Sequence, residues 1–227
     1  MKHLFFTLSV VLMISFAGCG SSSDANSAKT GEAENTATAT AGAKALNVDL
    51  AGSKATWTGF GVGHTHSGNI TMKEGVVNVE NGNITSGKFM FDMKQINVTD
   101  GTEGDKLKSL IGHLSTGFFK TDSFPTSTFE ITKVEALTGD ANATHTITGN
   151  LTLNGITKSL SFPSKVALTG DNLATNATFK FNRTLWNIME NSKNNKLFDL
   201  KKFANNAVED DIEMTLDIKA SPATAAN

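Results

Sequence analysis

Two histidines separated by one threonine, His64 and His66, are the side chains of this chain best placed to bind a metal ion. On a β-strand, residues two apart project to the same face, so these two rings would lie close enough to share one ion. A closed site needs further ligands, and the first carboxylate after the pair is Glu74, eight residues beyond His66. The sequence does not predict a metal cofactor, and a histidine-dependent metal-binding protein or enzyme remains an alternative that depends on this pair.

Nucleophilic catalysis has no recognisable motif in the sequence. The Gly-x-Ser-x-Gly turn that presents a catalytic serine is not present, and the serines have no spacing relation to a histidine. The acidic pair Asp210-Asp211 precedes a strand pattern, which is typical of a solvated turn. We therefore predict a protein that is not an enzyme.

The only arginine, Arg183, lies two residues after Phe181 and three before Trp186. If strand alternation continues, its side chain faces the same side as Phe179 and Phe181, which is the apolar side. A charge facing inwards is costly unless it is paired. Two roles follow: an ion pair with a buried carboxylate that fixes the strand register, or a contact with the polar end of a ligand at the mouth of a cavity.

The N-terminal residues carry a signal for covalent modification. A basic start precedes an apolar run over residues 4–16, which is shorter than the roughly 20 residues that a spanning helix needs. Residues 17–19 read Ala-Gly-Cys, the core of a bacterial lipobox, although Phe16 stands where leucine is preferred. Cys19 is the only cysteine, so it has no disulfide partner within the chain. We predict residues 1–18 to be a lipoprotein signal peptide and Cys19 to be lipidated.

The segment after the cysteine is poor in apolar side chains. Residues 20–45 contain no large apolar residue, so we predict that 19–45 form a flexible linker with a reach of about 30 Å. Residues 46–220 are then the folded domain, and 221–227 a disordered tail. Gly20 is not the aspartate that marks inner-membrane retention, so we expect a lipid-anchored protein of the cell envelope, at the outer membrane.

Composition and periodicity indicate an all-β domain. A net charge of −2 provides no electrostatic basis for binding nucleic acid. Fifteen phenylalanines and two tryptophans predict a large apolar interior. Apolar and polar residues alternate in 147–153 and 212–218, and Asn154-Gly155 is typical of a tight hairpin turn. We count about eight to ten strands of an antiparallel barrel or sandwich, and composition alone leaves both open.

Two segments depart from this alternation. Leu107, Leu110 and Leu114 have helical spacing and follow Thr102, a candidate helix cap, which predicts a helix of about a dozen residues. The stretch 195–205 also spaces its apolar residues as a short helix or an ordered loop would.

Four motifs occur in order along the chain, together with a His-x-Gly after the first long strand. They are Gly112–Phe119 (GHLSTGFF), Phe124–Glu130 (FPTSTFE), Leu151–Lys158 (LTLNGITK) and Phe181–Ile188 (FNRTLWNI), and the His-x-Gly is His66-Ser67-Gly68. Together they resemble the YceI-like family over about residues 46–220. Two features depart from the family pattern: Asn187 stands where glycine is common, and 189–206 is individual.

The resemblance implies an extended antiparallel lipocalin-like β-barrel of about eight strands with one or two short helices. It also implies an apolar tunnel for a polyisoprenoid, an isoprenoid quinone or a similar lipid. His113, Phe118 and Phe119 would lie near the mouth, and Arg183 with Trp186 near the polar end of the ligand. The remaining ligand-binding positions that the resemblance implies are Trp57, Phe89, Phe91, Phe129, Leu151, Leu153, Phe179 and Phe181.

We therefore expect a cell-envelope lipoprotein that binds a long apolar or amphiphilic ligand inside its barrel, as a carrier or a sink. Its expected partners are the membrane, through the N-terminal lipid anchor, and the lipid ligand, and a homodimer stays open. The third alternative is a structural or adaptor lipoprotein without a ligand.

Overall fold

The computed structural model describes residues 27–196 and 204–223, most of which belong to strands or to the turns between them. The strands are β1 (Lys29–Glu32), β2 (Lys44–Val48), β3 (Lys54–Gly61), β4 (His64–Asn69), β5 (Thr71–Glu80), β6 (Asn83–Asp92), β7 (Thr126–Ala136), β8 (His145–Leu153), β9 (Ile156–Thr169), β10 (Asn172–Asn182) and β11 (Asp211–Ser221). The helical segments are η1 (Met93–Gln95), α1 (Gly104–Gly112), η2 (His113–Phe118), η3 (Arg183–Trp186) and η4 (Ala204–Asn206).

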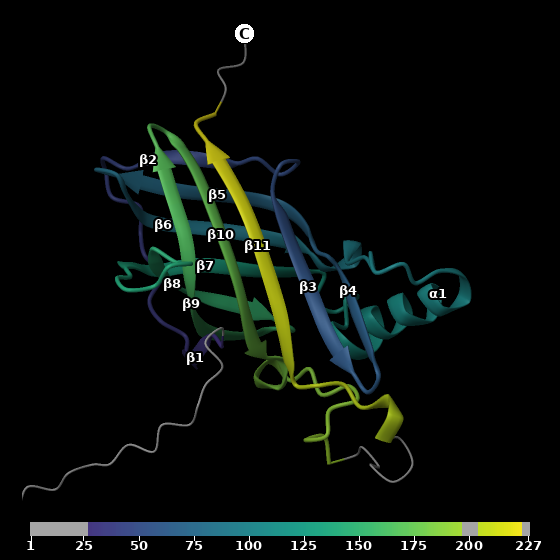
Figure 1. The fold of residues 1–227 in the computed structure, drawn as a ribbon. Helices are drawn as coiled ribbons and strands as arrows, with labels where there is room; N and C mark the ends of the chain where they lie inside the picture. The colour runs from purple at the N-terminus through teal and green to yellow at the C-terminus, as the bar shows by residue number, and fades with distance from the viewer. Residues whose placement is uncertain (1–26, 197–203, 224–227) are drawn as a thin grey trace, which may run out of the picture.

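Within the described residues, eight strand positions form a closed antiparallel ring. Neighbours follow the order β2, β5, β6, β7, β8, β9, β10 and β11, and β11 pairs again with β2. β3 continues β2 along β11, and β4 leads into β5, so these two strands lengthen existing positions. In Figure 1, β3, β10 and β11 run steeply across the front while β5, β6 and β7 cross behind them. The predicted antiparallel barrel of about eight strands is confirmed.

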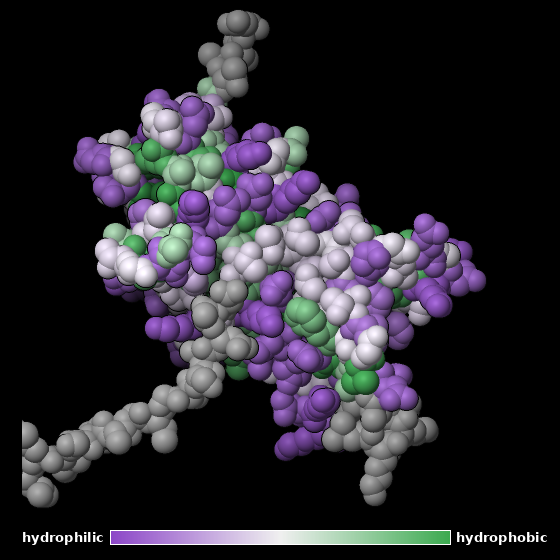
Figure 2. Space-filling model, in the orientation of Figure 1, coloured by the Kyte–Doolittle hydropathy of each residue, from purple (hydrophilic) through white to green (hydrophobic). Residues whose placement is uncertain are grey.

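Strand alternation places the apolar side chains inside this ring. On β11, Ile212, Met214, Leu216 and Ile218 face the interior, as their spacing predicts. The outer face seen in Figure 2 is largely hydrophilic or neutral. The Asn154-Gly155 hairpin is also confirmed, since both residues have positive φ angles, 48° and 74°, as the tight turn requires.

The predicted helix connects β6 to β7 and projects from one side of the barrel (Figure 1). The nine residues of α1 and the six of η2 run on without a break, and Leu114 of η2 is buried. The expected cap at Thr102 is wrong: the helix begins at Gly104, and the Thr102 N–H donates to Asp100 instead. No helix among the described residues is long and apolar enough to cross a bilayer.

The second helical expectation, at 195–205, falls mainly on residues 197–203, which lie outside the described residues. Next to them, Ala204–Asn206 form the short 3-10 turn η4.

The structure differs from the expected flexible linker over residues 27–45. β1 lies in the barrel wall and pairs along its whole length with β9, and Glu34 is held by Asn150 on β8. The Asn150 amide accepts from the Glu34 N–H at 2.9 Å and donates to the Glu34 carbonyl at 2.6 Å. Small polar side chains predict no apolar packing, but their backbone can still complete the open edge of a strand. These residues are therefore ordered by backbone hydrogen bonds, although their composition is that of a linker.

Replacing Asn150 with alanine tests this attachment. The substitution removes both hydrogen bonds to the Glu34 backbone, so we expect the free energy of unfolding to fall by about 1–3 kcal/mol. Urea unfolding followed by circular dichroism measures the change. Asn47→Ala, at an exposed position on β2, is the matched control and should change stability by less than about 0.5 kcal/mol. Equal losses in the two variants would contradict the role given to Asn150.

Candidate ligand-binding site

A long cavity runs through the barrel between the two crossing faces. The space between its atoms measures about 1110 Å³ with its openings to solvent included. On β10, alternate residues from Leu173 to Phe181 line the cavity. That span corresponds to about 26 Å at about 3.3 Å per residue. The cavity is therefore narrow for its length, a shape that suits an extended chain.

Nine of the positions that the resemblance implied lie on the wall of this cavity. They are Trp57, Phe89, Phe91, Phe119, Phe129, Leu151, Leu153, Phe179 and Phe181. The sequence interpretation missed further lining residues, among them Ile70, Met93, Ile131, Ile147, Leu160, Phe162, Ala177 and Met214. Strand alternation could have found most of them: Leu160 and Phe162 have the same spacing on β9 as Phe179 and Phe181 have on β10.

Aromatic rings cross the cavity as a chain of contacts from one strand to the next. The centroids of Phe89 and Phe129 are 6.4 Å apart, and those of Phe129 and Phe162 are 5.7 Å apart. Phe162 and Phe179 stack with centroids 4.0 Å apart and planes inclined by 13°. Rings in such arrangements attract each other beyond their area of contact, which gives one side of the cavity a firm wall.

The hydrogen-bond donors of the cavity wall are all used within the protein. Trp57 Nε1 donates to the Asn97 carbonyl at 3.2 Å, and Ser127 donates to the Thr152 carbonyl at 2.8 Å. Ser164 donates to the Asn176 carbonyl at 3.0 Å, so the 2.7 Å contact between Ser164 and Thr175 must use the Thr175 proton. No charged side chain is among the described residues that line the cavity. The interior therefore offers a ligand apolar contact and no free donor.

The connection between β10 and β11, which lies at the lower end of the barrel in Figure 1, begins at Arg183, and this side chain is 1% exposed. Its guanidinium donates to the backbone carbonyls of Ile188 at 2.6 Å, Glu209 at 3.0 Å and Val208 at 3.1 Å. Asp210, the expected kind of carboxylate partner, lies further away at 3.8 Å. Burial lowers the pKa of Arg183, and the charge of Asp210 opposes this shift.

Of the two roles foreseen for Arg183, the ion pair with a largely buried carboxylate is present, with Asp210, although the shorter contacts are to backbone carbonyls. Because three carbonyls of the connection between β10 and β11 need donors, the guanidinium holds that connection, and it does not line the cavity. It also lies 5.1 Å from the centre of the Phe118 ring.

Trp186 and Phe118 belong to the same closure. The Trp186 indole donates to the Leu151 carbonyl at 3.0 Å, and its ring meets Phe181 edge-on. Asn154 donates to the Phe118 carbonyl at 2.8 Å. Neither Trp186 nor Phe118 lines the cavity, and His113 is exposed on the outer side of η2. These positions support the end of the cavity but do not form its wall.

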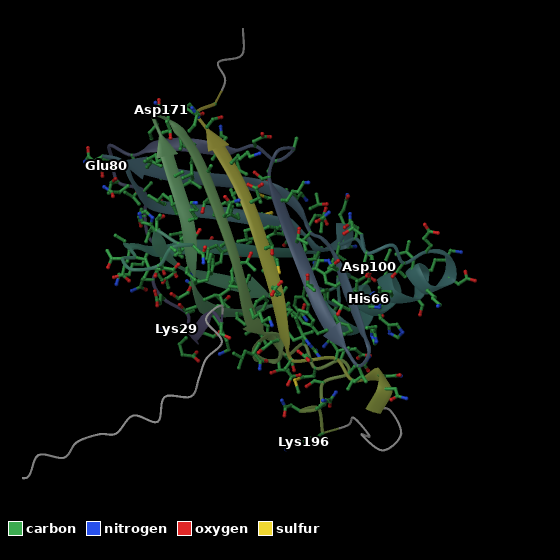
Figure 3. The ribbon with its side chains drawn as sticks, in the orientation of Figure 1. Lys29, His66, Glu80, Asp100, Asp171 and Lys196 are labelled. Carbon is green, nitrogen blue, oxygen red and sulfur yellow. The ribbon has the colours of Figure 1, made fainter. Side chains whose placement is uncertain are left out.

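His64 and His66 lie on the same face of β4, as predicted, with ring centres 5.2 Å apart. Figure 3 shows His66 and Asp100 together, beside the helical connection, and His66 Nδ1 is 2.7 Å from Asp100 Oδ2. Hydrogen bonds from the Thr102 side chain, from His66 and from backbone N–H groups lower the pKa of Asp100. Among the described residues, no three histidine, cysteine or acidic side chains gather as metal ligands would. The contact between His66 and Asp100 holds the loop before α1 against β4.

The glycine of the His66-Ser67-Gly68 motif has a steric reason. A Cβ atom at Gly68 would lie 1.7 Å from the Asn97 carbonyl oxygen, which is the acceptor for the Trp57 indole. Only glycine lets this loop approach β4 closely enough to hold Trp57 in the cavity wall.

A closed antiparallel barrel of eight strand positions around a narrow apolar cavity defines a protein with a lipocalin-like fold. Residues 46–220 match the YceI-like domain, and the chain belongs to that family. No curated protein matches the chain in sequence.

Solved structures share the fold at low sequence identity. BcnA of Burkholderia cenocepacia is 18% identical with a TM-score of 0.59, covering 77% of this chain and 99% of its own. A polyisoprenoid binding domain from Saccharophagus degradans, implicated in plant cell wall breakdown, is 10% identical with a TM-score of 0.55, covering 78% and 98%. The YceI protein of Campylobacter jejuni is 17% identical with a TM-score of 0.51, covering 69% and 85%. β1 lies before the residues that match the family.

Arg183→Gln tests the closure of the lower end. Because the variant leaves three backbone carbonyls without their charged donor, we expect a loss of about 3 kcal/mol or more in unfolding free energy. Lys165→Gln, on the exposed side of β9, is the control. Chemical denaturation of both variants decides the question, and a loss at Arg183 no greater than that at Lys165 would exclude the structural role.

Asp100→Asn tests the hydrogen bonds that converge on this carboxylate. Its pKa in the folded state lies below the ordinary value of 3.8, so its ionised form stabilises the fold above that pH. The contribution is lost as the pH falls below 3.8. We expect the stability difference between wild type and variant to stay constant above about pH 5 and to shrink as the pH is lowered from 3.8 towards about 2, measured by urea unfolding. The exposed Asp105→Asn serves as the control, and a pH-independent difference at Asp100 would contradict the assignment.

Proposed function

We propose that this protein is a lipid-anchored carrier or sink for a long apolar chain, such as a polyisoprenoid, in the bacterial cell envelope. The observation that carries this proposal is the elongated cavity whose wall is apolar and whose donors are all committed. The polyisoprenoid binding domain of Saccharophagus degradans, which shares the fold, supports the same class of ligand. Burial of a chain there is driven by the removal of apolar surface from water.

The absence of free hydrogen-bond donors on the described cavity wall also determines which part of a ligand can enter the cavity. A ligand carbonyl inside the cavity would find no donor, at a cost of about 1–3 kcal/mol. We therefore propose that the chain occupies the cavity and that a polar headgroup, including a quinone ring, stays outside it. Recognition then depends on the length and width of the chain rather than on hydrogen bonds.

Lipidation of Cys19 supplies the attachment to the membrane in this proposal. Ser27 is already bridged to Lys180 in the wall, so only the residues between Cys19 and Ser27 separate the anchor from the barrel. That distance is at most about 29 Å when fully extended. The barrel would work close to the surface of the membrane that supplies its ligand, and we place that membrane at the outer side of the envelope.

Filling the cavity tests the function. Ala177 lines the cavity on β10, so Ala177→Phe should weaken binding of retinol, an apolar isoprenoid alcohol, by about tenfold or more. Ala174→Phe adds the same group on the exposed side of the same strand and should leave binding unchanged. Quenching of tryptophan fluorescence by retinol gives the affinities, and circular dichroism verifies that both variants fold.

Native mass spectrometry of the protein purified from its membrane gives an independent readout. We expect a copurifying lipid in the wild type and in Ala174→Phe, and its loss in Ala177→Phe. A wild-type protein that neither copurifies with lipid nor takes up retinol would rule out the carrier function.

A further inference from the structure

The wall of the barrel contains a slot between β9 and β10. At the upper end, Lys165–Thr169 of β9 pair directly with Asn172–Asn176 of β10. Further down, the same edge of β9 pairs instead with β1, where Lys29 lies opposite Ser161 and Glu32 opposite Lys158. The two long strands have therefore parted, and the N-terminal strand fills the space between them.

β1 is held unequally on its two sides. It pairs with β9 along its full length, but it meets β10 at one bridge, between Ser27 and Lys180, where the Ala28 N–H donates to the Lys180 carbonyl at 2.8 Å. Three of its four side chains are exposed, and the residue that packs against the core is Ala28, just before β1. A short strand with so little buried apolar surface can open locally at a small fraction of the cost of global unfolding.

The innermost layer of the slot is the stack of Phe162 and Phe179. These rings come from the two strands that part, lie 4.0 Å apart and both face the cavity. Outside the stack lies β1, where the small side chain of Thr30 pairs with the inward-facing Leu160. The wall is therefore two layers deep at this point, a short strand and one pair of rings.

Buried core side chains lie at both ends of the barrel. At the lower end, Trp186 and Ile188 are 0% and 1% exposed. At the upper end, Leu46, Leu173 and Ala220 are buried between β2, β10 and β11. A ligand passing through either end would have to displace core side chains, whereas the slot requires only that β1 leave its place.

We propose that this slot is the ligand portal: residues 27–32 leave it, and the chain enters between β9 and β10 past Phe162 and Phe179. The portal rests on the proposed function, since it presupposes a chain that enters the cavity. The segment that leads back to Cys19 joins the barrel at this point, so the portal lies at the part of the wall tethered closest to the membrane.

A disulfide that reversibly joins β1 to β9, called a lock below, tests the portal. Gly31 and Ser159 are paired, and a Cβ built at Gly31 lies 3.9 Å from the Ser159 Cβ, within the range of about 3.5–4.5 Å found in disulfides. The variant is the full chain with Cys19→Ser, Gly31→Cys and Ser159→Cys. When it is oxidised, we expect retinol uptake to slow about tenfold or more with unchanged equilibrium affinity, and reduction to restore the rate. Stopped-flow tryptophan fluorescence gives both quantities.

The control is a second lock, Ala167→Cys with Ala174→Cys, across exposed paired positions where β9 and β10 are already joined. It should leave the uptake rate unchanged. A complementary variant, Asn150→Ala, loosens the chain after β1 and should speed uptake. Equal rates in the oxidised and reduced Gly31–Ser159 variant, or equal slowing by both locks, would overturn the portal while leaving the carrier function in place. Failure of the reduced proteins to bind retinol at all would overturn the proposed function, and the portal with it.

Discussion

The structure depends on one constraint: a wall around an apolar cavity must satisfy its backbone hydrogen bonds within the wall itself. An open sheet could face an apolar interior, but its edges would leave N–H and C=O groups unpaired. Here the pairing of β11 with β2 and β3 closes one side of the ring, and β1 fills the slot on the other. The cavity exists because the ring is closed, and its narrow width follows from the eight strand positions.

The same requirement explains why the described interior surface is apolar. The polar side chains of the cavity wall donate within the protein: the Trp57 indole and the Ser127 and Ser164 hydroxyls to backbone carbonyls, and the Thr175 hydroxyl to Ser164. At the lower end, the Arg183 guanidinium likewise donates to three carbonyls of the closing connection. The surface that faces the cavity is therefore apolar, because the polar groups of the wall are already hydrogen-bonded within the protein.

The fold and much of the cavity wall could be predicted from sequence because alternation and turn residues are local signals. Phe179 and Phe181 face inwards as their spacing requires, and Asn154-Gly155 makes the expected turn. The carbonyl partners of Arg183 could not be predicted, since backbone carbonyls carry no sequence signature. β1 was missed for a related reason: its small polar residues resemble a linker, and its place depends on an unpaired edge of β9 far away in the chain. Amino-acid composition indicates how much apolar surface a segment can bury, but it does not indicate which strand edge its backbone will pair with.

The position of β1 also affects how the molecule can assemble. The strand that completes the wall is made first, yet its partners on β9 and β10 are made more than a hundred residues later, as the pairing of Lys29 with Ser161 shows. Contacts of such long sequence separation form slowly, because the intervening chain must be ordered before they repay its entropy. A chain that emerges N-terminus first would therefore keep its barrel open until most of the domain was available to fold. Closure of the wall by β1 is then a late event in folding.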